Sequence, residues 1–228
     1  MILPRWDRAQ TSPLAFYDTE MTGLDPSKNE IIEIGIVRES PRGGDHVFDS
    51  VLGICRRAGL PEPKTVSSNG RTFSWTTKVK PKRPEDHHER AYLVNGYNGD
   101  EWSDAPDFAM VAPVLSIVLN DCIIIGSNPE IDIDFTRSEF DRLGAEPPRH
   151  VRRTIDIRTL AHEHLVPLGL KGTGLDAVCD FLGIHISPRH RALPDALRTR
   201  EVYHTIFRAG PLDLLMLRLR RSRQESEP

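Results

Sequence analysis

Short apolar runs and helically spaced apolar residues alternate along this chain of 228 residues, and together they predict an α/β fold. Runs rich in β-branched and aromatic residues predict strands at Leu14–Asp18, Glu30–Glu39, Arg71–Val79, Cys122–Gly126 and Thr154–Ile157, with a weaker strand pattern at Val47–Ile54. Helical spacing predicts helices at Asp86–Asn95, Asp107–Asn120, Ile133–Leu143, Leu175–Leu182, Ala192–Arg208 and Pro211–Arg223. The wholly apolar run at Cys122–Gly126 is typical of a parallel strand, so we expect a mixed sheet flanked by helices.

The order of these elements favours one domain with short additions. We expect a lead-in at 1–12, a domain at 13–210 with an insertion of open role at about 41–71, and a basic helix and tail at 211–228. A turn at Asp25–Asn29 predicts that the first two strands are antiparallel neighbours.

Composition adds little about function but indicates a compartment. The chain is 38% hydrophobic and 28% charged, and its net charge of −3 excludes no class of partner. Its three cysteines form no C-x-x-C pair, which suits reduced thiols. The first ten residues lack the apolar core of a secretion signal, and no run of eighteen apolar residues occurs, so we expect a cytoplasmic protein without membrane contact.

Two acids one residue apart, Asp18 and Glu20, follow directly after the first apolar run. Residues i and i+2 of a strand point to the same face, so both carboxylates emerge side by side. Their repulsion would keep one of them protonated unless a cation lay between them, and oxygen ligands suit magnesium or manganese. Two solvated acids at an edge strand are the alternative, and this short pattern alone favours it.

Two further polar clusters follow predicted elements. Asn128 and Asp132 follow the apolar strand, at the carboxyl edge where open α/β sheets bind ligands. Asp132 is alternatively a cap of the helix at Ile133. His190 precedes a helix whose first turn contains Pro194 and Asp195, which directs an imidazole and a carboxylate to one pocket. Taken singly, a surface histidine and an N-terminal helix charge are the simpler interpretations.

The three clusters in this order resemble the motifs of the DEDDh, or DnaQ-like, family of 3′–5′ exonucleases, which includes proofreading subunits, RNase T and oligoribonuclease. The family's motifs D-x-E-T/M-T-G-L, N-x-x-x-D and H-R-A-x-x-D-A stand here at Asp18–Leu24, Asn128–Asp132 and His190–Ala196. The resemblance covers roughly residues 14–208. It implies a ribonuclease H-like fold with a mixed five-stranded sheet flanked by helices. Ile131, Ser127 and Pro194 depart from the usual family residues, at positions that affect packing and substrate contacts.

The resemblance also implies the roles of the site residues. Asp18, Glu20, Asp132 and Asp195 would hold two Mg²⁺ ions, for which Mn²⁺ can substitute, and His190 would accept a proton from the attacking water. The backbone or hydroxyl groups of Thr22 and Gly23 would meet the terminal 3′-OH. The substrate-binding residues that the resemblance implies are Met21, Thr22, Gly23, Leu24 and Asn128, with Leu24 wedged under the last base.

The implied activity is removal of nucleoside monophosphates from single-stranded or frayed 3′ ends, with DNA favoured and a polymerase or replication partner open. An exoribonuclease of the RNase T or oligoribonuclease type is the alternative within the class. From another class, a catalytically idle nucleic-acid-binding module is disfavoured because all five catalytic-type residues are present. A nucleotide-cofactor enzyme is disfavoured because the sequence has no glycine fingerprint.

Overall fold

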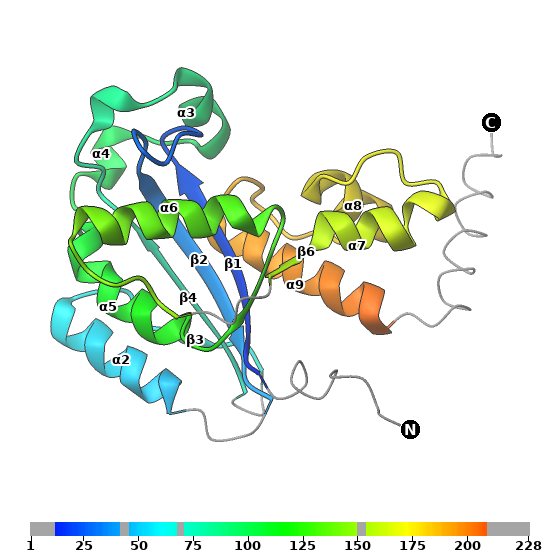
Figure 1. Cartoon of the computed structure of the whole chain (residues 1–228), viewed down its shortest axis with the longest axis horizontal. Helices are drawn as coiled ribbons and strands as arrows, with labels where there is room; N and C mark the ends of the chain where they lie inside the picture. The colour runs from blue at the N-terminus through cyan, green and yellow to red at the C-terminus, as the bar shows by residue number, and fades with distance from the viewer. Residues whose placement is uncertain (1–11, 42–45, 68–70, 150–153, 209–228) are drawn as a thin grey trace.

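The centre of the fold is a six-stranded mixed sheet in the order β3-β4-β2-β1-β5-β6 (Figure 1). A computed structural model describes residues 12–41, 46–67, 71–149 and 154–208. The strands are β1 (Leu14–Met21), β2 (Ile31–Glu39), β3 (Lys64–Thr65), β4 (Thr72–Lys78), β5 (Ile123–Gly126) and β6 (Thr154–Asp156). The predicted mixed sheet is confirmed, and the two-residue strand β3 at its edge adds a sixth strand to the five expected.

The first two strands form the predicted antiparallel pair, in which Asp18 lies opposite Gly35 and Glu20 opposite Glu33. The turn between them is closed by the backbone carbonyl of Asp25, which accepts from the N–H groups of Lys28 and Asn29 at 3.0 and 2.7 Å. β4 pairs antiparallel with β2, whereas β5 runs parallel to β1 and β6 parallel to β5. The carboxyl ends of β1, β5 and β6 therefore meet at one edge of the sheet.

Helices cover both faces of the sheet (Figure 1). One buried cluster joins Ala15, Tyr17 and Ile34 of the sheet to the helices on one face, and a second joins Phe16, Val37 and Ile125 to those on the other face. The first face carries α2, α5 and α6, and the second carries α7, α8 and α9. The helices are α2 (Val47–Ala58), α3 (Glu89–Asn95), α4 (Gly99–Trp102), α5 (Phe108–Val118), α6 (Pro129–Arg142), α7 (Ile157–His164), α8 (Leu175–Leu182) and α9 (Ala192–Arg208), with 3₁₀ turns at Pro84–Asp86 and Val166–Leu168.

The strand predicted at Val47–Ile54 is wrong, because this segment is the helix α2. Val51 and Cys55, four residues apart, are its buried residues and face one side, which is helical spacing. Gly59 ends the helix in the left-handed conformation, with its N–H bonded to the Cys55 carbonyl. β-branched content suggested a strand, but the spacing of the buried residues decides the structure.

The segment expected as an insertion contributes to the core through its described residues. In its described part, α2 packs against α5, and Lys64–Thr65 extends the sheet beside β4. The predicted helix at Pro211–Arg223 and nearly all of the predicted lead-in lie outside the described residues. Within the described ranges, no helix is both long and apolar enough to cross a membrane.

Candidate metal centre

Asp18 and Glu20 lie at the carboxyl end of β1, on the face of the sheet that α9 covers. Successive side chains of a strand point to opposite faces, so Phe16, Asp18 and Glu20 share one face of β1. Phe16 packs in the core beneath α9, whereas Ala15 and Tyr17 pack in the core on the other face. Asp195, in the first turn of α9, brings its carboxylate to them, and one oxygen of each of these three acids lies within 4.8 Å of the others. The structure thus joins three acids that the sequence places as much as 177 residues apart.

Gly35 lets α9 come this close to the sheet. It stands on β2 directly opposite Asp18, and a Cβ atom there would lie 2.1 Å from the carbonyl carbon of Ala192 and 2.2 Å from the nitrogen of Leu193. Both contacts are with backbone, which cannot swing aside as a side chain does. The absence of a side chain at position 35 therefore sets the position of the first turn of α9, and with it Asp195.

The carboxylate of Asp195 is held at both oxygens. The backbone N–H of His190 donates to Oδ2 at 3.1 Å, and Nη1 of Arg198 donates to Oδ1 at 2.8 Å. Arg198 lies one turn further along α9 and its side chain is 1% exposed. These two hydrogen bonds therefore hold the Asp195 carboxylate in the acid cluster without a bound ligand.

Asp132 reaches the site from the opposite face of the sheet. Its Oδ1 accepts from the backbone N–H and from the hydroxyl of Thr19, at 2.8 and 2.7 Å. Thr19 stands between Asp18 and Glu20 on β1, so its side chain points to the α6 face. Among the described residues, the three converging acids are Asp18, Glu20 and Asp195. Asp132 lies beside them and is linked to β1 by its hydrogen bonds with Thr19.

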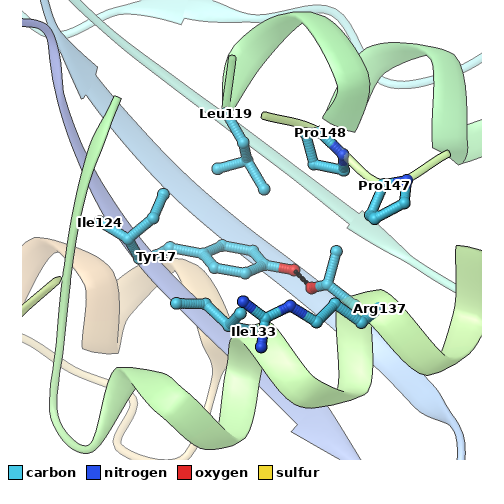
Figure 2. Close-up of a pocket in the computed structure, with 8 residues that line it drawn as sticks. Tyr17, Leu119, Ile124, Ile133, Arg137, Pro147 and Pro148 are labelled. Carbon is cyan, nitrogen blue, oxygen red and sulfur yellow. Dashed lines mark hydrogen bonds between the residues drawn. The ribbon is translucent and has the colours of Figure 1, made fainter. Parts of the chain in front are cut away.

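A second link fixes α6 against β1. The hydroxyls of Tyr17 and Thr136 share a hydrogen bond of 2.7 Å, which Figure 2 shows as a dashed line, and Thr136 Oγ1 donates to the carbonyl of Asp132 at 2.7 Å. The Tyr17 side chain borders a small cavity of about 20 Å³, lined also by Leu119, Ile133 and Pro147 (Figure 2). Residues 17 and 19 of β1 thus hold the turn of α6 that carries Asp132.

The alternative role of Asp132 as a helix cap is not what the structure shows. α6 begins at Pro129, four residues before the predicted start, so Asp132 lies inside its first turn. The residue before the helix is Asn128, in the left-handed conformation (φ 69°) that asparagine tolerates, and its backbone N–H donates to Asp156 Oδ1 at 3.1 Å. Asn128 therefore makes the turn from β5 into α6 at the edge of the site.

Burial raises the pKa values of the four acids, and repulsion from neighbouring acids adds to the shift at Asp18 and Glu20. Burial raises the pKa of Glu20 to about 8, with the charge of Asp195 as the next cause. Burial also raises the pKa of Asp132 to about 7, although the hydrogen bonds from Thr19 oppose the shift. The pKa of Asp18 is raised well above its ordinary value by burial and then by the charge of Asp132. The pKa of Asp195 is raised by burial and lowered in part by Arg198. A bound cation would stabilise the ionised form of these acids, so the cluster is suited to cation binding.

His190 is next to the acids through its backbone, whereas its side chain lies toward α8. The imidazole is 49% exposed, and its Nε2 is 3.8 Å from Asp176 Oδ2. Its backbone has a positive φ of 56°. The predicted place on the loop before α9 is confirmed, while a direct contact of the imidazole with the four acids is not among the contacts of this structure.

A cavity of about 770 Å³ opens beside Glu20 and is lined by Met21, Gly23 and Leu24, together with residues of the 86–95 segment. Leu24 is 85% exposed, as a residue that contacts a ligand would be. Thr22 is fully buried, and its hydroxyl accepts from the backbone N–H of Glu30 at 2.9 Å. The hydroxyl oxygen is thus an acceptor within the protein, and its own hydrogen can still donate to a ligand.

The turn after β1 suggests that Gly23 is needed for a backbone conformation that other residues avoid, but this interpretation is wrong, because the φ of Gly23 lies outside the left-handed region. A Cβ atom at position 23 would instead lie 2.3 Å from Oδ1 of Asn29, whose side chain fills that space. Asn29 Oδ1 accepts from the backbone N–H of Asp25 at 3.0 Å. Glycine is needed here for close packing of the turn.

Three residues support the site in ways that the sequence did not indicate. Asn95 donates from Nδ2 to the carbonyl of Met21 at 2.9 Å and so ties α3 to the end of β1. Arg191 pairs with the buried Glu33 at 2.7 Å, beside His190 in the chain. Arg198 was visible only as a basic residue three positions after Asp195, which is helical pairing distance.

The donor set fits a divalent cation of the hard class. The three converging ligands are all carboxylate oxygens, which Mg²⁺ and Mn²⁺ prefer over nitrogen and sulfur donors. Their raised pKa values show that the protein holds negative charge there at a cost that a cation would relieve. The arrangement is thus suited to binding a divalent metal and a negatively charged substrate.

Comparisons with known proteins agree with this chemistry. A family model described as Exonuclease (RNase_T) matches residues 15–203. The DNA polymerase III subunit epsilon of Rickettsia conorii is 29% identical over 189 residues, which are 82% of this chain and 70% of that protein.

Two solved structures share the fold. Escherichia coli exonuclease I, in complex with a dT13 oligonucleotide, superposes with a TM-score of 0.61 at 19% identity over 85% of this chain and 41% of that one. The nuclease domain of 3′hExo, a DEDDh family member bound to rAMP, gives a TM-score of 0.60 at 15% identity over 88% of this chain and 94% of that one. This chain thus spans less than half the length of exonuclease I.

Proposed function

Because this chain belongs to the exonuclease family, we propose that it is a metal-dependent 3′–5′ exonuclease that removes nucleoside monophosphates from single-stranded nucleic acid. The observation that carries the proposal is the convergence of Asp18, Glu20 and Asp195 within 4.8 Å. DNA is the favoured substrate, since the relative from Rickettsia conorii is named as a DNA polymerase subunit.

The acids would hold Mg²⁺ as the natural metal, with Mn²⁺ as a substitute. Asp18, Glu20 and Asp195 supply oxygens on the α9 face, and Asp132 supplies one from the α6 face beside Thr19. Bound divalent ions would activate the attacking water and stabilise the leaving 3′-oxygen. Two such ions would balance the four negative charges of these residues.

His190 is the proposed general base, because an imidazole can accept a proton near neutral pH. It is fixed five residues before Asp195 by the bond between its backbone N–H and that carboxylate. Its imidazole is half-exposed, so it is accessible to a proton on water at the site.

The cavity beside Glu20 is the proposed site of the terminal nucleotide. Met21 and the exposed Leu24 would contact the last base, while the backbone around Gly23 would meet the 3′-OH. Asn128, at the edge of the acid site, would lie along the substrate strand.

A polymerase partner and a cytoplasmic location stay predictions. The assignment of residues 13–210 as the catalytic domain also stays a prediction.

Degradation of end-labelled strands tests this function. The full chain would be incubated with single-stranded DNA and RNA of one sequence, labelled at either end, with Mg²⁺, Mn²⁺ or chelator. A 3′–5′ exonuclease yields labelled mononucleotide at once from the 3′ label and a ladder from the 5′ label. The proposal fails if neither strand is degraded with either metal, or if chelator leaves degradation unchanged.

A Glu20→Gln chain serves as the matched control, since it keeps the shape of the side chain and removes its charge. It should abolish metal-dependent cleavage, which separates the activity of this protein from that of a contaminating nuclease. Faster cleavage of RNA than of DNA would assign the chain to the exoribonuclease alternative.

A further inference from the structure

A buried arginine in the acid site has no part in the function proposed above. Arg198 is 1% exposed, and its guanidinium pairs with Asp195, one of the three acids whose carboxylates converge at the sheet edge. A guanidinium is costly to bury unless carboxylates pair with it, so its position calls for a cause.

Arg198 pairs with two carboxylates from different elements. Nη1 donates to Asp195 Oδ1 at 2.8 Å within α9, and Nη2 donates to Asp176 Oδ1 in α8. Asp176 in turn faces the His190 imidazole at 3.8 Å and Arg189 at 3.7 Å. One arginine therefore connects an acid of the cluster to the residue that faces the imidazole.

Without Arg198, the carboxylate of Asp195 would lose one of the two hydrogen bonds that hold it in the acid cluster. This carboxylate lies within 4.8 Å of those of Asp18 and Glu20, and like charges at that distance repel one another. The backbone N–H of His190 would remain as its one hydrogen-bond donor in the described contacts. A carboxylate held by a single donor beside two like charges would turn away from them, and this change would remove a metal ligand.

We propose that Arg198 is a positioning residue, which holds the carboxylate of Asp195 in place beside those of Asp18 and Glu20 and, through Asp176, holds the loop that carries His190. This inference rests on the proposed function. Arg198 would act indirectly, through its bonds to Asp195 and Asp176. It acts on the ligand, as hydrogen-bonded neighbours of metal ligands do in metalloenzymes.

Arg200 offers a matched control on the same helix. It also bridges two carboxylates, Glu39 and Glu201, each at 2.6 Å, but it does so at the other end of β2 from the acid site. Replacing either arginine with methionine removes one guanidinium and two ion pairs from α9. Only Arg198→Met removes them from Asp195.

The test is the affinity of the full chain for Mn²⁺ without nucleic acid, measured by electron paramagnetic resonance, with kcat and KM on single-stranded DNA. Arg198→Met should weaken Mn²⁺ binding by about 10–100-fold and lower kcat by a similar factor, with little change in KM. Arg198→Lys, which keeps the charge but not the two-pronged geometry, should recover part of the affinity. Arg200→Met should bind Mn²⁺ as the parent does.

Unchanged Mn²⁺ affinity in both Arg198 variants would overturn the inference, and tighter binding would overturn it by showing that the arginine competes with the cation. If Arg198→Met does not fold, Arg198→Lys decides by the same criterion. A parent chain that binds no Mn²⁺ would overturn the proposed function, whereas a parent that binds it beside unaltered variants would overturn the Arg198 role alone.

Discussion

His190 combines two tasks in one residue, and the structure separates them. Its backbone N–H fixes the carboxylate of Asp195, while its exposed side chain is the proposed base. The positive φ of 56° is uncommon for residues other than glycine and is best tolerated by asparagine and aspartate. A substitution at this position therefore has to respect the backbone before it can report on the imidazole.

We predict that His190→Asn lowers kcat by about 10²–10⁴-fold while metal affinity stays close to that of the parent. Asparagine keeps the N–H that Asp195 accepts and tolerates the left-handed backbone, but it cannot take a proton from water. Single-turnover kinetics on a 3′-labelled strand and Mn²⁺ binding would be measured together.

His190→Ala is the companion variant, and it should lose additional stability because alanine disfavours this backbone conformation. Parent-like turnover of His190→Asn at neutral pH would refute the general-base role. A large loss of metal affinity in that variant would show instead that the imidazole helps to form the metal site.

At the scale of elements, the site depends on the close approach of α9 to β2. The start of α9 touches the sheet at Gly35, opposite Asp18, and Arg191 ties the same turn to Glu33 on β2. The position of Asp195 is therefore set by backbone packing as well as by its own hydrogen bonds.

Gly35→Ala is expected to lower the free energy of unfolding by about 1–3 kcal/mol, because the added methyl group meets the backbone of Ala192 and Leu193. In the protein that remains folded, displacement of Asp195 should cut kcat by about 100-fold. Urea unfolding and turnover at a temperature where the variant is folded would measure the two effects.

Gly53 in α2 supplies the control. A Cβ atom there has only the flexible end of Arg57 nearby, at 3.4 Å, so Gly53→Ala should stabilise the helix by roughly 0.5–1 kcal/mol and leave turnover unchanged. If Gly35→Ala were as stable and active as the parent, the close approach would not govern the site.

The elements predicted from sequence succeeded where burial and local spacing agree. Leu175–Leu182 and Ala192–Arg208 form helices with the expected bounds, and the apolar run at 122–126 forms the parallel strand. Val47–Ile54 failed because its β-branched residues favoured a strand while its buried positions follow a helical period. Propensity is the weaker of these two signals when a segment packs on a core.

The acids of the site followed from motif spacing, but their arrangement did not. Nothing in the sequence shows that Asp132 approaches from the α6 face through Thr19, since that contact joins residues 113 positions apart. The pairing of Arg198 with both Asp195 and Asp176 is equally hidden, because it depends on how α8 lies against α9. Tertiary contacts of this kind are set by packing and not by local pattern.

For the whole molecule, the sheet separates two apolar cores and leaves the acids at the edge between them. The acid cluster thus holds like charges close together, where burial strengthens their repulsion. Such a site is expected to reduce the stability of the metal-free protein, as active sites often do.

The loss of stability that the acid cluster causes in the metal-free protein should depend on pH. The folded-state pKa values of Glu20, about 8, and Asp132, about 7, lie above those of the unfolded chain, so the folded state binds more protons between roughly pH 5 and 8. The metal-free protein should therefore be most stable near pH 5 and lose stability as the pH rises toward 8. Thermal melts in chelator across this range would measure the slope, and a melting temperature that rises from pH 5 to 8 would contradict the prediction.

Divalent metal should reverse that slope, because a cation stabilises the ionised acids only in the folded state. At about 100 times the dissociation constant, Mg²⁺ or Mn²⁺ should raise the melting temperature by ~5–10 °C, and more at pH 8 than at pH 5.

Asp18→Asn should melt higher than the parent in chelator at pH 8, because it removes one of the repelling charges, and it should gain little from metal. Asp25→Asn removes an exposed acid of the neighbouring turn and should respond to metal as the parent does. Equal melting of the parent with and without metal at pH 8 would mean that Asp18, Glu20 and Asp195 do not form a cation site.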